Sequence, residues 1–221
     1  THERSSAASD VYKRQTYAID RVRNDFVALQ YVMDHTELCI KLIKKLSSGV
    51  QGKIVLDQKN FKQSSCARQP QRTVELMEAG CLVGTNNGNG RGFASMHAKS
   101  WVFDQKVAFV GSMNLSHNSM ENNKEHVMMT TDPRVVRDVY NDILAMYENS
   151  TKRSLAEAKE AKAAAEKKRD EKEARAKARA KAKGNQKMSD DITESSAVEE
   201  VAPEEDQRHP IAGAVLNPPS R

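Results

Sequence analysis

The chain has 221 residues, and its 35 Lys and Arg against 30 Asp and Glu give a formal net charge of +5. This length suffices for one good-sized domain with extensions. No run of about 20 apolar residues occurs, so no membrane-spanning segment is predicted. The three cysteines, Cys39, Cys66 and Cys81, are odd in number and lack metal-ligand spacing, which indicates a reducing, intracellular compartment.

The charge is distributed unevenly. Residues 152–187 contain 14 Lys or Arg and 6 Asp or Glu, whereas residues 188–221 contain 2 and 8. The basic character therefore belongs mainly to an appendage. Composition predicts four segments: an extraneous or disordered stretch over 1–15, a folded domain over 16–150, a charged helix over 151–184 and an acidic disordered tail over 185–221.

The first 15 residues, THERSSAASDVYKRQ, are predicted to lie outside the fold. The run DVYKRQ resembles the translation of a common sequencing-adapter end, and a disordered N-terminus is the alternative. If the adapter interpretation holds, the native N-terminus is missing, together with any targeting signal. A mitochondrial signal or a hydrophobic anchor there would decide the compartment.

Residues 25–57 predict a strand, a helix and a second strand. Asp25–Met33 is apolar and short enough for a buried strand. Thr36 is predicted to cap a helix that ends at Gly49, and Lys53–Asp57 forms the next strand. Such a unit pairs its strands in parallel through a right-handed crossover. The helix buries a face made of Cys39, Leu42, Ile43 and Leu46.

Gln58–Arg72 is polar and basic, contains no acidic residue, and is predicted to be a loop. It either lines the site and attracts polyanions or is simply solvated, and the sequence favours neither alternative. Cys66 has no second Cys or His nearby, so we predict no zinc site. The next elements are a short helix over Thr73–Ala79, a short strand over Cys81–Val83 and a mobile loop over Asn86–Gly92.

The most informative stretch is Ser95–Asn114. If Phe93–Phe103 is a strand, His97 and Lys99 point to one face. An imidazole beside an ammonium group suits an anionic phosphorus centre, because imidazole can act as nucleophile or proton carrier near neutral pH and ammonium binds phosphate. The alternative is a hairpin that carries ordinary surface groups.

The second half of this stretch predicts the rest of a hairpin. Asp104 and Gln105 form the turn, and Val107–Val110 is the returning strand. Gly111 would let the backbone approach a ligand closely.

The polar residues of this stretch follow the pattern HxK(x)4D(x)6GSxN. Its members are His97, Lys99, Asp104, Gly111, Ser112 and Asn114. A further acid, Glu125, lies 28 positions after His97. The pattern resembles the motif of the phospholipase D superfamily, the HKD phosphodiesterases, and the resemblance extends over about residues 20–150.

The remaining elements complete an α/β pattern. Leu115–Asn123 is predicted as an irregular or short helical link and Glu125–Thr130 as a strand, while Asp132 and Pro133 begin a closing helix. Strands separated by helices predict a layered α/β domain. The resemblance implies an α-β-α phospholipase D-like domain from which an upstream strand and helix are missing.

A phosphodiester resists attack because its anionic oxygens repel nucleophiles and its leaving group is poor. A site must neutralise those oxygens, supply a nucleophile and protonate the leaving oxygen. Lys99, Asn114 and Ser112 suit phosphate binding. An ordinary imidazole pKa near 6.5 leaves His97 neutral at pH 7. The resemblance implies that His97 forms a covalent phosphohistidine.

The resemblance also implies roles for the two acids. Glu125 is expected to accept the other ring N–H of His97 and so to fix its tautomer. Asp104 is expected to support the hairpin rather than to carry protons. This chemistry requires no metal or other cofactor, and the sequence contains no cluster of residues at metal-ligand spacing.

The leaving oxygen needs a second histidine as its proton donor. Single-motif members of the family obtain it by pairing across a two-fold axis, so we expect a homodimer that shares one active site. The resemblance favours a phospholipid substrate of the cardiolipin type. The alternatives are an endonuclease of single-stranded or double-stranded nucleic acid and a non-catalytic module that binds anionic lipid or nucleic acid.

Residues 152–183 consist mainly of Ala, Lys, Glu and Arg, which predicts a helix. No apolar stripe repeats along it, so a coiled coil is not expected. Either the helix is simply solvated, or it is a basic arm for nucleic acid or an anionic membrane surface.

Overall fold

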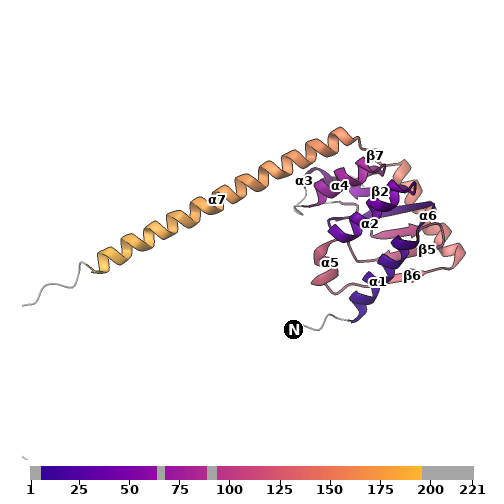
Figure 1. Cartoon of the computed structure of the whole chain (residues 1–221), viewed down its shortest axis with the longest axis horizontal. Coiled ribbons are helices and arrows are strands. Elements are labelled where there is room, and N and C mark those ends of the chain that lie inside the picture. Colours follow the sequence, from indigo (N-terminus) through magenta and orange to yellow (C-terminus); the bar gives the residue numbers. More distant parts are fainter. Residues whose placement is uncertain (1–5, 64–67, 89–93, 196–221) are drawn as a thin grey trace, which may run out of the picture. The chain divides into compact units, whose positions relative to one another are not determined.

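A computed structural model describes residues 6–63, 68–88 and 94–195 (Figure 1). The chain divides into two compact units, Thr1–Glu173 and Ala174–Arg221. The first unit contains all the strands of the described part of the chain, and the described residues of the second are helical.

Within the described residues, the first unit is built on a seven-stranded sheet in the order β6-β5-β4-β1-β2-β3-β7. The three strands β1, β2 and β3 are parallel, whereas β4 runs antiparallel to β1 and the outer strands continue antiparallel. The strands are β1 (Asp25–Gln30), β2 (Gln51–Asp57), β3 (Leu82–Asn86), β4 (Ser100–Phe103), β5 (Val107–Gly111), β6 (Val127–Thr130) and β7 (Thr151–Lys152).

Helices cover both faces of this sheet. Successive side chains of β1 alternate between two apolar clusters, with Phe26 in the cluster that includes α1, α2 and α4 and Val27 in the cluster that includes α6. Such a strand, buried on both faces, is typical of an α-β-α sandwich. The helices are α1 (Ser6–Arg21), α2 (Thr36–Ser47), α3 (Gln58–Gln63), α4 (Gln69–Glu78), α5 (His117–Glu121), α6 (Pro133–Glu148) and α7 (Leu155–Ser195).

The layered α/β prediction is confirmed, and the first crossover has the expected form. Parallel β1 and β2 are joined by α2, after which Gly49 adopts a φ of +95°. The N-cap is His35, however, and not Thr36, because the His35 side chain accepts a hydrogen bond from the backbone N–H of Leu38.

The prediction of a loop over Gln58–Arg72 is wrong. The described part of this segment forms α3 and the start of α4, and residues 64–67 lie outside the described residues. The Asp57 carboxylate accepts hydrogen bonds from the backbone N–H groups of Lys59 and Asn60 and so caps α3, while Pro70 lies in the first turn of α4. Of the loop predicted over Asn86–Gly92, Asn86 ends β3, and residues 89–92 are also outside the described part.

Helix α1 begins within the segment that the sequence places outside the fold. Residues 6–15 are helical rather than disordered, and residues 1–5 are not described. Farther along α1 and just beyond its end, Ile19 and Val22 are buried in the core, which anchors the helix to the sheet. The adapter interpretation concerns the origin of these residues and stays a prediction.

Helix α7 begins in the first unit, where Ala158 is buried in the core cluster and Leu155 packs against it. The helix extends to Ser195, beyond the predicted end at residue 184, and the acidic segment 196–221 lies outside the described residues. Among the helices that can be described, none is long and apolar enough to cross a bilayer.

Candidate active site

The predicted site residues gather at one edge of the sheet. Because β4 runs antiparallel to β1, His97 and Lys99, which precede β4, lie at the edge where β1 ends. Strand β5 returns to this edge and ends at Gly111, followed by Ser112. In open α/β sheets, ligands bind beyond the carboxyl ends of the parallel strands, which is where these groups lie.

His97 and Lys99 are in direct contact. The Lys99 Nζ lies 2.8 Å from the His97 Nδ1 and donates a 2.6 Å hydrogen bond to the His97 carbonyl oxygen. Lys99 is only 5% exposed, whereas the His97 side chain is open to solvent. A buried ammonium therefore supports an accessible imidazole.

This arrangement lowers the pKa of both groups. Partial burial and the adjacent Lys99 ammonium lower the pKa of His97 below its ordinary value, although the Asp57 carboxylate opposes the shift. Burial also lowers the pKa of Lys99, and the Glu125 carboxylate opposes that shift. Burial and the Lys99 ammonium both favour the neutral form of His97, in which the imidazole can act as a nucleophile.

Residues 94–99 do not extend the strand as predicted. Strand β4 begins only at Ser100, which pairs with Leu29 of β1. Before this point, the Gly111 backbone N–H still donates to the Lys99 carbonyl oxygen at 3.1 Å, and the Met96 backbone N–H donates to the buried Asp57 carboxylate at 3.1 Å. His97 consequently lies on a loop that precedes β4. The strand pairing of β4 therefore does not fix the orientation of the His97 side chain.

Glu125 is not in the expected position relative to His97. Its carboxylate accepts hydrogen bonds from the Ser112 hydroxyl and from the Asn123 Nδ2, whereas the His97 Nδ1 faces Lys99. Although burial acts in the opposite direction, these hydrogen bonds lower the pKa of Glu125. Glu125 thus acts electrostatically on Lys99, and the expected contact with the imidazole is absent from the described structure.

Ser112 and Gly111 hold the loop that carries Glu125. The Ser112 hydroxyl donates to Glu125 and accepts from the His126 backbone N–H at 3.1 Å. A Cβ atom at Gly111 would collide with the His126 carbonyl oxygen, so glycine is needed for close packing against β6. This packing, and not the approach of a ligand, is what the structure shows for Gly111.

Asn114 joins the segment after β5 to the segment after β1. Its Oδ1 accepts a 3.2 Å hydrogen bond from the Val32 backbone N–H, and Gln30 similarly accepts from Leu115 at 2.8 Å. The carbonyl oxygen of Asn114 is thus engaged in the fold, and its Nδ2 is the group that could donate to a phosphate.

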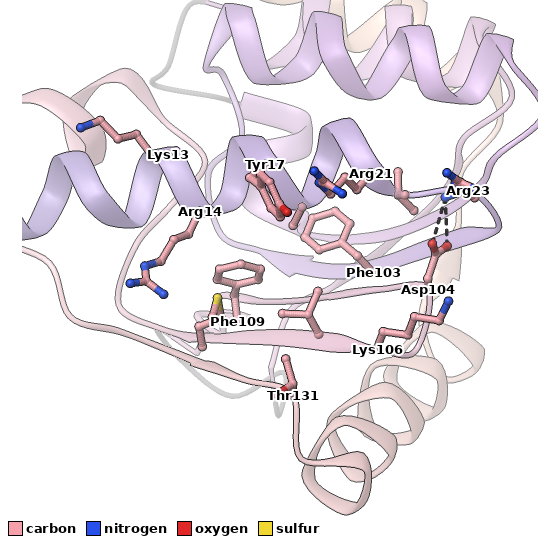
Figure 2. A pocket seen from close by; sticks show the side chains of 14 residues that line it. Lys13, Arg14, Tyr17, Arg21, Arg23, Phe103, Asp104, Lys106, Phe109 and Thr131 are labelled. Carbon is pink, nitrogen blue, oxygen red and sulfur yellow. Dashed lines mark hydrogen bonds between the residues drawn. The ribbon is translucent and has the colours of Figure 1, made fainter.

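Asp104 lies at the far end of β4, away from His97. Its carboxylate accepts hydrogen bonds from the backbone N–H groups of Arg23 at 2.9 Å, Asn24 at 2.7 Å and Asp25 at 3.1 Å. Figure 2 shows the contact with Arg23. Asp104 and Gln105 both have a φ of +52°, as in the type I′ turns that suit two-residue hairpins. Asp104 thus ties the hairpin turn to the start of β1.

The larger of the two cavities we describe also lies at this far end. It encloses about 900 Å³ between α1 and strands β4 to β6 (Figure 2). Basic side chains such as Arg21 and Lys106 line it together with the apolar Phe103 and Phe109. Neither His97 nor Lys99 contributes to it, so its size gives no guide to the chemistry.

The Asp104→Ala variant is expected to lose about 2 kcal/mol in free energy of unfolding, because three backbone N–H groups lose a charged acceptor. Urea denaturation at pH 7 measures this loss. Asp138→Ala, which removes an exposed acid on α6, is the control and should change stability by no more than about 0.5 kcal/mol. Equal effects of the two substitutions would contradict an anchoring role for Asp104.

Sequence reasoning missed Tyr31, which lies directly after β1. Its ring centroid is 4.5 Å from that of His97 and 5.1 Å from the Lys99 Nζ. The Asn60 side chain holds the Tyr31 carbonyl oxygen at 3.1 Å. Its position in the sequence could have indicated a role at the site, because Tyr31 and Asp57 both stand at the carboxyl end of a parallel strand.

No group of three or more His, Cys, Asp or Glu side chains that could hold a metal ion occurs in the part of the chain we describe. Cys39 and Cys81 are both buried, and burial raises the pKa of Cys39 to about 12. These two thiols are therefore unreactive core groups.

Comparison with known proteins identifies the family. Residues 17–147 match the family described as "Cardiolipin synthase, PLD-like domain". The DISARM protein DrmC of Bacillus paralicheniformis is 30% identical over 129 residues, which span 52% of this chain and only 50% of that protein. The match thus covers about half the length of this curated relative.

Two solved structures have a similar fold. NucT from Helicobacter pylori has a TM-score of 0.57 and 22% identity, with 66% of this chain and 92% of that chain covered. Nuc from Salmonella typhimurium, a phospholipase D family member, has a TM-score of 0.57 and 16% identity, with coverage of 64% and 90%. The family match extends over more than half of the sequence, and the chain therefore belongs to the PLD-like domain family of the phospholipase D superfamily.

Proposed function

We propose that this chain is a phosphodiesterase that cleaves nucleic acid through a covalent phosphohistidine at His97. The observation that carries the proposal is the buried Lys99 ammonium in contact with an accessible imidazole. The ammonium can neutralise a phosphate oxygen, and its charge helps to keep His97 neutral and able to attack.

The contact between Lys99 and the His97 Nδ1 indicates how substrate would start the reaction. While Lys99 donates to Nδ1, the neutral ring carries its proton on Nε2. An arriving phosphate oxygen is a stronger acceptor for the ammonium, because both partners are charged. Once Lys99 turns to the phosphate, the ring proton can move from Nε2 to Nδ1. This change of tautomer leaves the Nε2 lone pair available for attack.

The chemistry then has two steps. In the first, the Nε2–P bond forms and the P–O bond to the leaving group breaks, and the leaving oxygen takes a proton from a second histidine, which must start in its protonated, imidazolium form. In the second, water attacks phosphorus, the P–N bond breaks, and the second imidazole takes the proton from water. We propose that this second imidazole is His97 of another copy, so that a homodimer forms one shared site.

The surroundings of the site favour nucleic acid over phospholipid. The large apolar side chains that are exposed in the described residues include none from 30–34, 57–62, 94–99 or 111–126, the segments that surround His97. Acyl chains at the site would need apolar surface there, whereas a polynucleotide needs polar and cationic groups. Cardiolipin-type hydrolysis, which the sequence alone favoured, stays the second hypothesis because of the family that the chain matches.

The test offers three substrates to the purified chain in excess EDTA: bis-p-nitrophenyl phosphate, a single-stranded oligonucleotide and cardiolipin vesicles. We expect cleavage of the first two, since Lys99 and His97 supply the charge neutralisation and the nucleophile. Activity that is lost on chelation and restored by one divalent ion would contradict the mechanism. Cleavage of cardiolipin without cleavage of the oligonucleotide would overturn the substrate assignment.

A further inference from the structure

We propose that the polar cavity beside α3 is a subsite that binds a second phosphate of a polynucleotide substrate and the base next to it. The cavity encloses about 450 Å³ and is lined by Gln58, Lys59, Asn60, Lys62 and Asn87. The inference rests on the proposed function, because it concerns a different part of the same substrate.

The lining has the chemistry of a nucleotide site. Its described lining residues offer two ammonium groups and three carboxamides, and none of these five carries a carboxylate or is an apolar residue. Ammonium groups bind phosphate, and carboxamides donate and accept hydrogen bonds together, as the edges of bases require.

The two cations are available to a ligand. Lys59 Nζ donates to the Ala94 carbonyl oxygen at 3.2 Å, and no described carboxylate forms an ion pair with Lys59 or Lys62. Asp57, which directly precedes these lining residues in sequence, is 1% exposed and accepts hydrogen bonds from the backbone N–H groups of Lys59, Asn60 and Met96. It is not among the described residues that line the cavity.

The cavity is physically connected to the catalytic histidine. Asn60 in its wall holds the carbonyl oxygen of Tyr31, and the Tyr31 ring lies against His97. Two strand spacings, from β4 to β2, separate the two places along the sheet edge, which corresponds to about 10 Å. A polynucleotide presents further phosphates on both sides of the one that is cleaved, whereas a small diester presents only one.

The test compares two double variants of equal charge change. Lys59→Gln with Lys62→Gln alters the cavity, and Lys44→Gln with Lys106→Gln removes two exposed lysines elsewhere. For each, kcat/KM is measured on a single-stranded oligonucleotide and on bis-p-nitrophenyl phosphate at several salt concentrations. For the cavity variant, the ratio of kcat/KM on the oligonucleotide to kcat/KM on the small diester should fall about tenfold. The slope of log kcat/KM against log salt on the oligonucleotide should become shallower by about 0.7, as expected for the loss of one phosphate contact.

The control variant should keep the ratio within about twofold of wild type. Lys62→Glu alone, at an exposed position, gives an independent variant and should lower the ratio further than Lys62→Gln. An unchanged ratio and salt slope in the cavity variant, or an equal loss in the control, would overturn the subsite. A loss of activity in the cavity variant that appears only on cardiolipin vesicles, and not on the oligonucleotide, would also overturn the subsite. Failure of the wild type to cleave any diester would instead contradict the proposed function itself.

Discussion

The His97→Ala variant is expected to lose at least about 10⁴-fold in turnover of bis-p-nitrophenyl phosphate, because the nucleophile is removed and no other group can form the covalent intermediate. The fold should persist, since the His97 side chain is exposed and its hydrogen-bond partner is Lys99. Circular dichroism and urea denaturation measure the fold, and a stopped colorimetric assay measures turnover.

His126→Ala is the matched control, because His126 is also exposed and contributes backbone rather than side-chain groups to the Ser112 network. It should keep turnover within a few-fold of wild type. A folded His97→Ala protein that retained more than about 1% of wild-type turnover would refute the nucleophile assignment.

The same variant tests whether two copies share one site. If wild type and His97→Ala are refolded together in equal amounts, about a quarter of the dimers hold two histidines. Activity should then follow the square of the wild-type fraction. Activity that is proportional to that fraction, after subunit exchange has been verified, would show that each chain works alone.

Lys99→Gln is expected to lower turnover by about 10² to 10³-fold, because it removes the cation that neutralises the phosphate. It should also move the pH profile. Attack requires neutral His97, so activity falls as pH drops through the pKa of His97, which burial and the Lys99 ammonium lower. Without Lys99 that pKa rises, and the acidic limb of kcat/KM should move to higher pH.

The Glu125→Gln variant distinguishes the effect of Lys99 on the pKa of His97 from a general disturbance of the site. The Glu125 carboxylate raises the pKa of Lys99, so its removal should let Lys99 lose its proton at a lower pH, while the acidic limb of kcat/KM stays in place. An acidic limb that is unchanged in Lys99→Gln would contradict electrostatic coupling between Lys99 and His97.

Much of the fold could be predicted, because it depends on local patterns. The apolar face of α2, the turn at Asp104 and Gln105, and the Asp132 cap of α6 are all present in the structure. The predictions failed where long-range contacts decide the outcome. Strand β4 begins only at Ser100, and four residues earlier the Met96 N–H donates instead to the carboxylate of Asp57, which is distant in sequence.

In the site too, local spacing could be predicted from the sequence and long-range contacts could not. Spacing identified His97 and Lys99 as neighbours, and their contact follows from only two residues of separation. The partners of Glu125 could not be predicted, because they depend on how the 112–126 loop folds back on itself. Tyr31 escaped notice because a single aromatic after a strand carries no motif of its own.

The four residues of β4 separate Lys99, which precedes the strand, from Asp104, which follows it and binds the start of β1. Side chains in a strand alternate between faces, so one inserted or deleted residue would turn the ammonium away from its pocket while leaving every chemical group of the motif intact. The number of residues between Lys99 and Asp104 is thus fixed by the length of β4. A search for remote relatives should hold this interval constant and let the intervening apolar side chains vary.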